Sequence, residues 1–74
     1  MADATLSRSE VATVRRLVET LGLTEAARQL GVHPQSVTVI LSGREVRNGT
    51  VALVTRVLRR VASRHGIDTG GSDG

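Results

Sequence analysis

The segment from Leu23 to Gly43, with the sequence LTEAARQLGVHPQSVTVILSG, constrains the fold more than any other part of the chain. Gly31 tolerates the positive φ of a tight turn and ends a first short helix. Pro34 suits the first turn of a second helix, because its missing N–H is not needed there. A turn that short sets the two helices at about 90–120° to each other. The segment therefore predicts two crossed helices, with one face of the second helix pushed outwards.

The side chains of this segment fit such a crossing. Ala27 is small where the second helix is expected to pass closely over the first, and Val37 is expected to pack into the angle between the helices. The run from Val37 to Leu41, VTVIL, is β-branched enough for a strand. The proline and glycine signals on either side favour a helix over residues 33–42 instead, with His33 as its N-cap.

Capping signals and apolar periodicity predict one further helix on each side of this pair. Residues 7–10, SRSE, form a capping box, and the apolar residues after it recur on one helical face as far as Leu21. Thr24 and Asn48 are the predicted N-caps of the second and fourth helices. No stretch alternates between apolar and polar residues for long enough to predict a sheet, so we expect an all-α fold of four helices.

One domain is expected over residues 7–65, because a chain of 74 residues lies at the lower end of the size range of domains. Residues 1–6 are predicted to be a flexible polar lead, and residues 66–74, rich in Gly, Asp and Ser, a flexible tail. The chain has no cysteine, no long apolar run and no signal-peptide pattern at its start. These features favour a cytoplasmic protein without membrane contact.

The spacing of Ala27, Gly31 and Val37 resembles the helix-turn-helix of phage Cro and repressor proteins. It is also similar to the headpiece of lactose-repressor-type regulators. The best-matched stretches are GVHPQSV at 31–37 and LSGR at 41–44, and the chain departs from the family pattern at His33 and Val39. The resemblance implies a lambda-repressor-like domain that binds double-stranded DNA and reads it with helix 33–42.

The outward residues of helix 33–42 are then the candidates for contact with bases. Gln35 is the foremost, because a glutamine can bond the N6 and N7 atoms of adenine together, and Val39 can pack on a thymine methyl. The full set of predicted base contacts is Pro34, Gln35, Ser36 and Val39. The predicted contacts to the DNA backbone are Thr24, Thr38, Ser42, Arg44, Arg47 and Asn48.

The charge distribution favours a polyanionic partner. All ten basic residues are arginine, and residues 26–65 hold seven of them with Glu45 as the only acid, for a formal charge of +6. Clustered arginine is typical of phosphate binding. The absence of Phe, Trp and Tyr removes the platforms on which single-stranded bases stack, so a duplex is the expected partner.

The remaining charged and polar residues predict no catalytic or metal site. His33 and His65 lie far apart in the sequence without cysteine, and a cap and a helix end are their expected roles. Neither forms a recognisable nucleophile arrangement with a serine or an aspartate, so no enzyme, cofactor or small-molecule ligand is predicted. Arg56, Arg59 and Arg60 fit either the solvated face of a helix or a second DNA contact, and the solvated face is favoured.

Leu53 and Val57 widen the apolar stripe of the fourth helix. Either the first helix packs over them, or they form a two-fold dimer interface, which we favour because so small a domain is marginal alone. The resulting hypothesis is a homodimeric transcriptional repressor that reads an inverted-repeat operator. Two alternatives stay open, a protein-interaction module of a regulatory complex and a DNA-binding segregation or partition protein.

Overall fold

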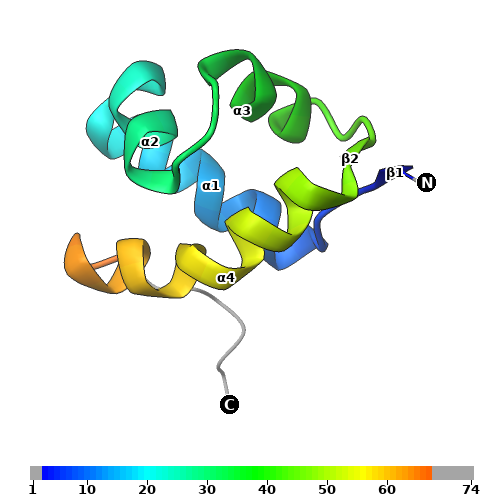
Figure 1. Ribbon diagram of the computed structural model, residues 1–74. Helices are drawn as coiled ribbons and strands as arrows, with labels where there is room; N and C mark the ends of the chain where they lie inside the picture. The colour runs from blue at the N-terminus through cyan, green and yellow to red at the C-terminus, as the bar shows by residue number, and fades with distance from the viewer. Residues whose placement is uncertain (1–2, 68–74) are drawn as a thin grey trace.

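The computed structural model describes residues 3–67. This part of the chain is mostly helical, as the sequence predicts, with two short strands besides (Figure 1). The strands pair antiparallel, with Asp3 opposite Arg47 and Ala4 opposite Val46. In chain order the elements are β1 (Asp3–Ala4), α1 (Arg8–Leu21), α2 (Leu23–Leu30), α3 (Pro34–Leu41), β2 (Val46–Arg47) and α4 (Asn48–Arg64).

The helix α1 begins at the predicted capping box. The Ser7 side chain accepts a hydrogen bond from the Glu10 amide at 3.2 Å, and the Glu10 carboxylate accepts one from the Ser7 amide at 2.9 Å. The start of α3 is also confirmed, because the His33 ring nitrogen Nδ1 accepts from the Gln35 amide at 3.0 Å, with Pro34 in the first turn. Both caps satisfy amides that have no partner within the helix.

The predicted caps of the other two helices are wrong. α2 begins at Leu23 with Gly22 as its N-cap, because Gly22 (φ 89, ψ 159) ends α1 and starts α2 within one residue. Thr24 therefore already lies in the first turn of α2. α4 begins at Asn48 itself, since the extended conformation required of an N-cap falls on Arg47 in β2. Neither helix has a side-chain hydrogen bond at its N-cap.

The two ends of the domain are more ordered than the sequence predicts. Residues 1–6 were predicted to be flexible, yet Asp3 and Ala4 pair with β2 and Leu6 is buried in the core. The sequence predicts that the flexible tail starts at residue 66, which is too early. Gly66 adopts a φ of 71, the amide of Ile67 donates to the Ala62 carbonyl at 2.8 Å, and the Ile67 side chain is buried. The rest of the predicted tail, residues 68–74, lies outside the described residues.

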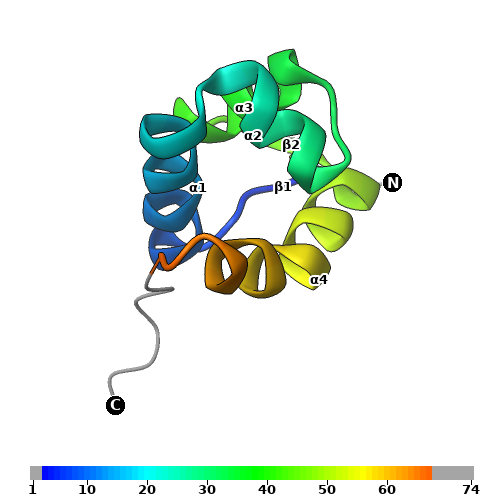
Figure 2. The ribbon, with the colours of Figure 1, turned by 90° about the vertical axis from the view of Figure 1, so that its left-hand side faces the viewer.

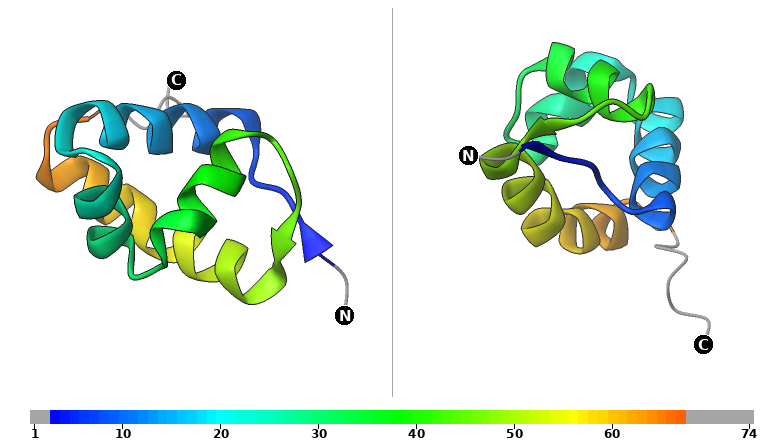
Figure 3. Two further views of the ribbon diagram at one scale, coloured as in Figure 1. Left: turned by 90° about the horizontal axis from the view of Figure 1, so that it is seen from above. Right: turned by 90° about the vertical axis from the view of Figure 1, so that its right-hand side faces the viewer.

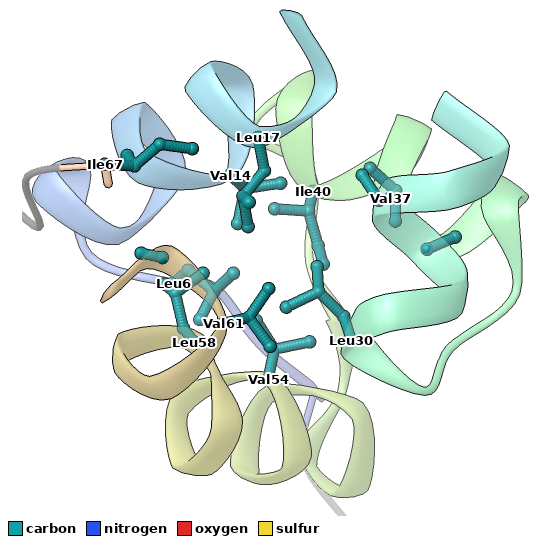
Figure 4. Packing of buried hydrophobic residues seen from close by; sticks show 13 residues of the cluster. Leu6, Val14, Leu17, Leu30, Val37, Ile40, Val54, Leu58, Val61 and Ile67 are labelled. Carbon is teal, nitrogen blue, oxygen red and sulfur yellow. The ribbon is translucent and has the colours of Figure 1, made fainter. Parts of the chain in front are cut away.

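The helices enclose a single apolar core (Figure 4). α1 packs against α2, α3 and α4, and α2 also packs against α3 and α4. Figure 2 shows α2 and α3 on one side of the core and α4 on the opposite side, with α1 along the edge between them. The largest fully buried side chains are Val14, Leu17, Leu30, Val37 and Val54. Each contributes about 1.5–3 kcal/mol by leaving water.

Candidate nucleic-acid interface

The connection between α2 and α3 is a tight turn of three residues, 31–33. Gly31 lies in the left-handed region (φ 78, ψ 26), and the Val32 amide donates to the Ala27 carbonyl at 3.0 Å. A Cβ on Gly31 would lie 3.8 Å from Leu53, which is an ordinary van der Waals contact, so there is room for a larger residue. Glycine is favoured here because of the positive φ of this residue. Ala27 and Val37 are both fully buried, which confirms their predicted packing.

The outward face of α3 carries the predicted base contacts. The side chain of Gln35 is exposed, whereas those of Pro34, Ser36 and Val39 are half-buried. α3 and α2 lie together at one surface of the molecule, and no other described element covers this face (Figure 3). The face therefore presents one flexible amide beside smaller polar and apolar groups.

Two hydroxyls on this face are already engaged. Thr38 donates to the Pro34 carbonyl at 3.3 Å, and Ser42 donates to the Val39 carbonyl at 2.7 Å. Both side chains are exposed, but in this conformation their hydroxyls offer a partner only lone pairs. A phosphate has no hydrogen to donate, so a phosphate contact by Thr38 or Ser42 requires the hydroxyl to rotate.

A hollow of about 600 Å³ lies between α3 and the start of α4. Its walls combine predicted base contacts with a predicted backbone contact, since Arg47 is extended in β2 directly across from α3. The complete lining is His33, Gln35, Ser36, Val39, Glu45, Val46, Arg47 and Thr50. The structure thus brings Gln35, Ser36 and Val39 together with Arg47.

Several residues of this hollow were not predicted. Thr50 belongs to the first turn of α4, and Glu45 belongs to the loop before β2. The pairing of β1 with β2 fixes this loop, and a pairing between residues more than forty positions apart leaves no local sequence signal. Glu45 is the one acidic side chain in the lining, and its negative charge repels an anion that approaches this part of the hollow.

The predicted backbone contacts Arg44 and Arg47 line different hollows. Arg44 lines one of about 560 Å³, together with Arg8 and Arg15 of α1. Arg15 also donates to the Leu41 carbonyl at 3.4 Å, which ties α1 to the C-terminal end of α3. Among the side chains of residues 5–67 the one ion pair joins Arg28 to Glu25 at 3.6 Å, so neither Arg44 nor Arg47 is paired with a carboxylate of that range.

Thr24 and Asn48 occupy corresponding places in two helices. Both are exposed and both lie in the first turn of a helix that has no side-chain cap. The amides of such a turn carry a partial positive charge that favours an anion. Their placement fits the predicted contact with phosphate, although the sequence assigned them to the caps themselves.

The predicted dimer residues lie at the margins of the core. Val57 packs on the edge of the core cluster, and Leu53 lines a hollow of about 370 Å³ beside the α2–α3 turn. Both side chains are half-buried. The apolar stripe of α4 is therefore largely covered within one chain, and the exposed face of the helix is formed by other residues.

The described residues contain no group of three or more His, Cys, Asp and Glu side chains that could hold a metal ion. In the same range, no helix is both long and apolar enough to cross a membrane. Searches against protein-family models, curated proteins and solved structures find no match to this chain.

Proposed function

We propose that this protein binds double-stranded DNA in a sequence-specific manner, with α3 in the major groove. The observation that carries the proposal is the uncovered polar face of α3, where Gln35, Ser36 and Val39 share a hollow with Arg47. In this proposal α2, the turn at Gly31 and α3 form a helix-turn-helix. A helix fits the major groove, which is about 12 Å wide.

Within this arrangement Gln35 is the principal reader of sequence. Its side chain is exposed and only its backbone amide is engaged, in the cap with His33, so both the amide oxygen and the amide nitrogen are available to an adenine. Val39, half-buried beside it, offers a methyl surface to thymine. Pro34 and Ser36 complete the contact surface and discriminate less, because neither offers two hydrogen bonds at once.

Backbone phosphates are held on both sides of α3. Arg44 and Arg47 follow the helix and carry no carboxylate partner within the described range, so their guanidinium groups are available for bidentate phosphate contact. The first turns of α2 and α4, with Thr24 and Asn48, offer backbone amides to further phosphates. These contacts fix the register of α3 and carry no sequence information.

The proposed role is transcriptional repression by a homodimer on an inverted repeat. A two-fold axis beside Leu53 and Val57 would relate two copies of α3, and such proteins bind half-sites spaced by about one helical turn. Arg60 and Arg64 lie on the same flank of α4 as Val57, three and seven residues further along. A dimer contact there has to keep these arginines of the two copies apart.

Selection of bound sequences from a random duplex pool tests the proposal. We expect an inverted repeat to be enriched by the unaltered protein and lost with Gln35→Ala. Gln29→Ala is the matched control, because this glutamine on α2 bonds Glu25 at 2.8 Å and lies away from the α3 hollow. A pool without any enriched sequence would contradict the proposal and favour the protein-interaction alternative.

A further inference from the structure

The exposed face of α4 carries a row of arginines that the proposed DNA contacts do not use, and only Arg60 of this row flanks the proposed dimer contact. Arg56, Arg59 and Arg60 are exposed and lie three and four residues apart, on the side of the helix away from the buried Val54 and Leu58. α4 contains no acidic residue over its 17 residues. The row is therefore a strip of positive charge without compensation from its own helix.

Such a strip costs stability in the free protein. Like charges three or four residues apart on a helix repel each other. The carboxylate of Glu10 shares a hollow of about 330 Å³ with Arg56 and Arg59 but accepts the Ser7 amide in the α1 cap. No ion pair joins it to either arginine in the described part of the chain. By contrast, Arg28 on α2 is paired with Glu25.

The position of the strip excludes the duplex bound by α3. Figures 1 and 2 place α3 and α4 on opposite sides of the core, and Figure 3 agrees from the other side. Arg56 and Arg59 line a hollow with Ser9, Glu10 and Thr13 of α1, whereas the α3 hollow reaches α4 only at Thr50. The two surfaces share no residue, so we expect a straight duplex on the α3 face to leave the arginine row uncovered.

We propose that the arginine face of α4 binds the phosphate backbone of a second DNA duplex, so that the protein bridges two duplexes. This inference rests on the proposed function for the first duplex. The guanidinium group suits the partner, because its planar fork matches phosphate oxygens in pairs. The rise from Arg56 to Arg60 is about 6 Å, against about 3.4 Å of duplex axis for each phosphate of a strand. The row therefore spans two to three phosphates.

A bridging assay tests the inference. The protein is bound to an immobilised duplex that carries its selected site, and capture of a labelled 30-base-pair duplex of random sequence is measured. We expect capture by the unaltered protein, and a loss of about tenfold or more when Arg56, Arg59 and Arg60 are all changed to Gln. Binding to the first duplex should change much less, because both α3 faces of a dimer stay intact.

The control variant changes Arg8, Arg16 and Arg28 to Gln. It removes an equal number of positive charges, three, from α1 and α2, so the loss of long-range attraction to DNA is the same in both variants. The ion pair between Arg28 and Glu25 is exposed and contributes little stability, so its loss should not unfold the control. Capture by this control should match that of the unaltered protein. Capture that survives in the α4 variant, or falls equally in the control, overturns the inference.

Two further outcomes separate this inference from its alternatives. If the protein binds vesicles of anionic phospholipid through these three arginines and captures no second duplex, the face belongs to a lipid surface and the inference is wrong. If the protein prefers no DNA sequence, the proposed function fails. In that case the inference is tested by the affinity for random duplex. It is overturned if the α4 variant binds random duplex as tightly as the unaltered protein does.

Discussion

The α3 face and the α4 face are both solvent-exposed helix surfaces, but they are built from different groups. Where the α3 face lines its hollow, it has the amide of Gln35, the hydroxyl of Ser36 and the half-buried Val39, with a single arginine across from them. The α4 face has a row of three exposed arginines, with the small hydroxyl side chains of Thr55 and Ser63 on the same helix. The comparison separates two tasks, since base edges are read by shaped hydrogen-bonding groups whereas phosphates are held by charge.

Salt is expected to produce the largest effect, because it acts on both faces. If about four phosphates are contacted, the slope of log K against log salt is about −3.6. Affinity for a duplex should then fall about 100-fold between 50 and 200 mM NaCl, as measured by fluorescence anisotropy. An affinity that does not change over this range would contradict the arginine contacts on either face.

The change Gln35→Ala sharpens the comparison on the α3 side. We expect a loss of about 1–3 kcal/mol on the selected site, with little change on random duplex, because the side chain contacts bases and not phosphates. Parallel titrations of both duplexes measure this difference. An equal loss on the two duplexes would show that Gln35 does not read sequence.

The change Arg44→Ala should have a smaller and more uniform effect. It removes one phosphate contact, so selected and random duplexes should both weaken several-fold, and the salt slope should become shallower by about one. Titrations at three salt concentrations give the slope. A loss confined to the selected site would move Arg44 into the group of base contacts.

The dimer contact is tested by changing Leu53 and Val57 together to Ser. We expect sedimentation equilibrium to show a shift from dimer to monomer at tens of micromolar protein, because a small interface depends on its few apolar side chains. Leu23→Ser is the control, since Leu23 is the exposed large apolar side chain of the described residues, at 37% exposure. An unaltered protein that is already monomeric would remove the dimer from the proposal.

The last expected effect is on the stability of the fold and not on DNA binding, through Gly31→Ala. An alanine at a φ of 78 costs about 1–2 kcal/mol, which lowers the Tm of a domain of this size by roughly 5–15 °C. Gly49→Ala is the control, because Gly49 has no positive φ and nothing within 4 Å of an added Cβ. Only the Gly31 variant should unfold earlier in a thermal melt followed by circular dichroism.

Features that depend on near neighbours could be predicted from the sequence. The capping box at Ser7, the cap at His33 and the turn at Gly31 each involve partners within five residues, and all three are present. Burial of Ala27 and Val37 followed from the same local spacing. For the candidate site, this was enough to place Gln35, Ser36 and Val39 on one face.

Features that depend on distant partners could not be predicted. β1 and β2 have two residues each, too few for an alternating pattern, and the paired residues lie more than forty positions apart in the sequence. Arg47 of β2 holds the N-cap position of α4 that the sequence predicts for Asn48, and Thr50 in the first turn of α4 lines the hollow. The burial of Leu6 and Ile67 likewise depends on a core that forms only when all four helices meet.

The small β1–β2 ladder has a consequence for the thermodynamics of the proposed complex. It holds Val46 and Arg47 in an extended conformation in the free protein, across from α3. Ordering one residue of a loose loop costs about 1–2 kcal/mol of conformational entropy, and here that ordering is complete before any partner arrives. The complex therefore forms with a preorganised loop, and more of the favourable contact energy at Arg47 remains as affinity.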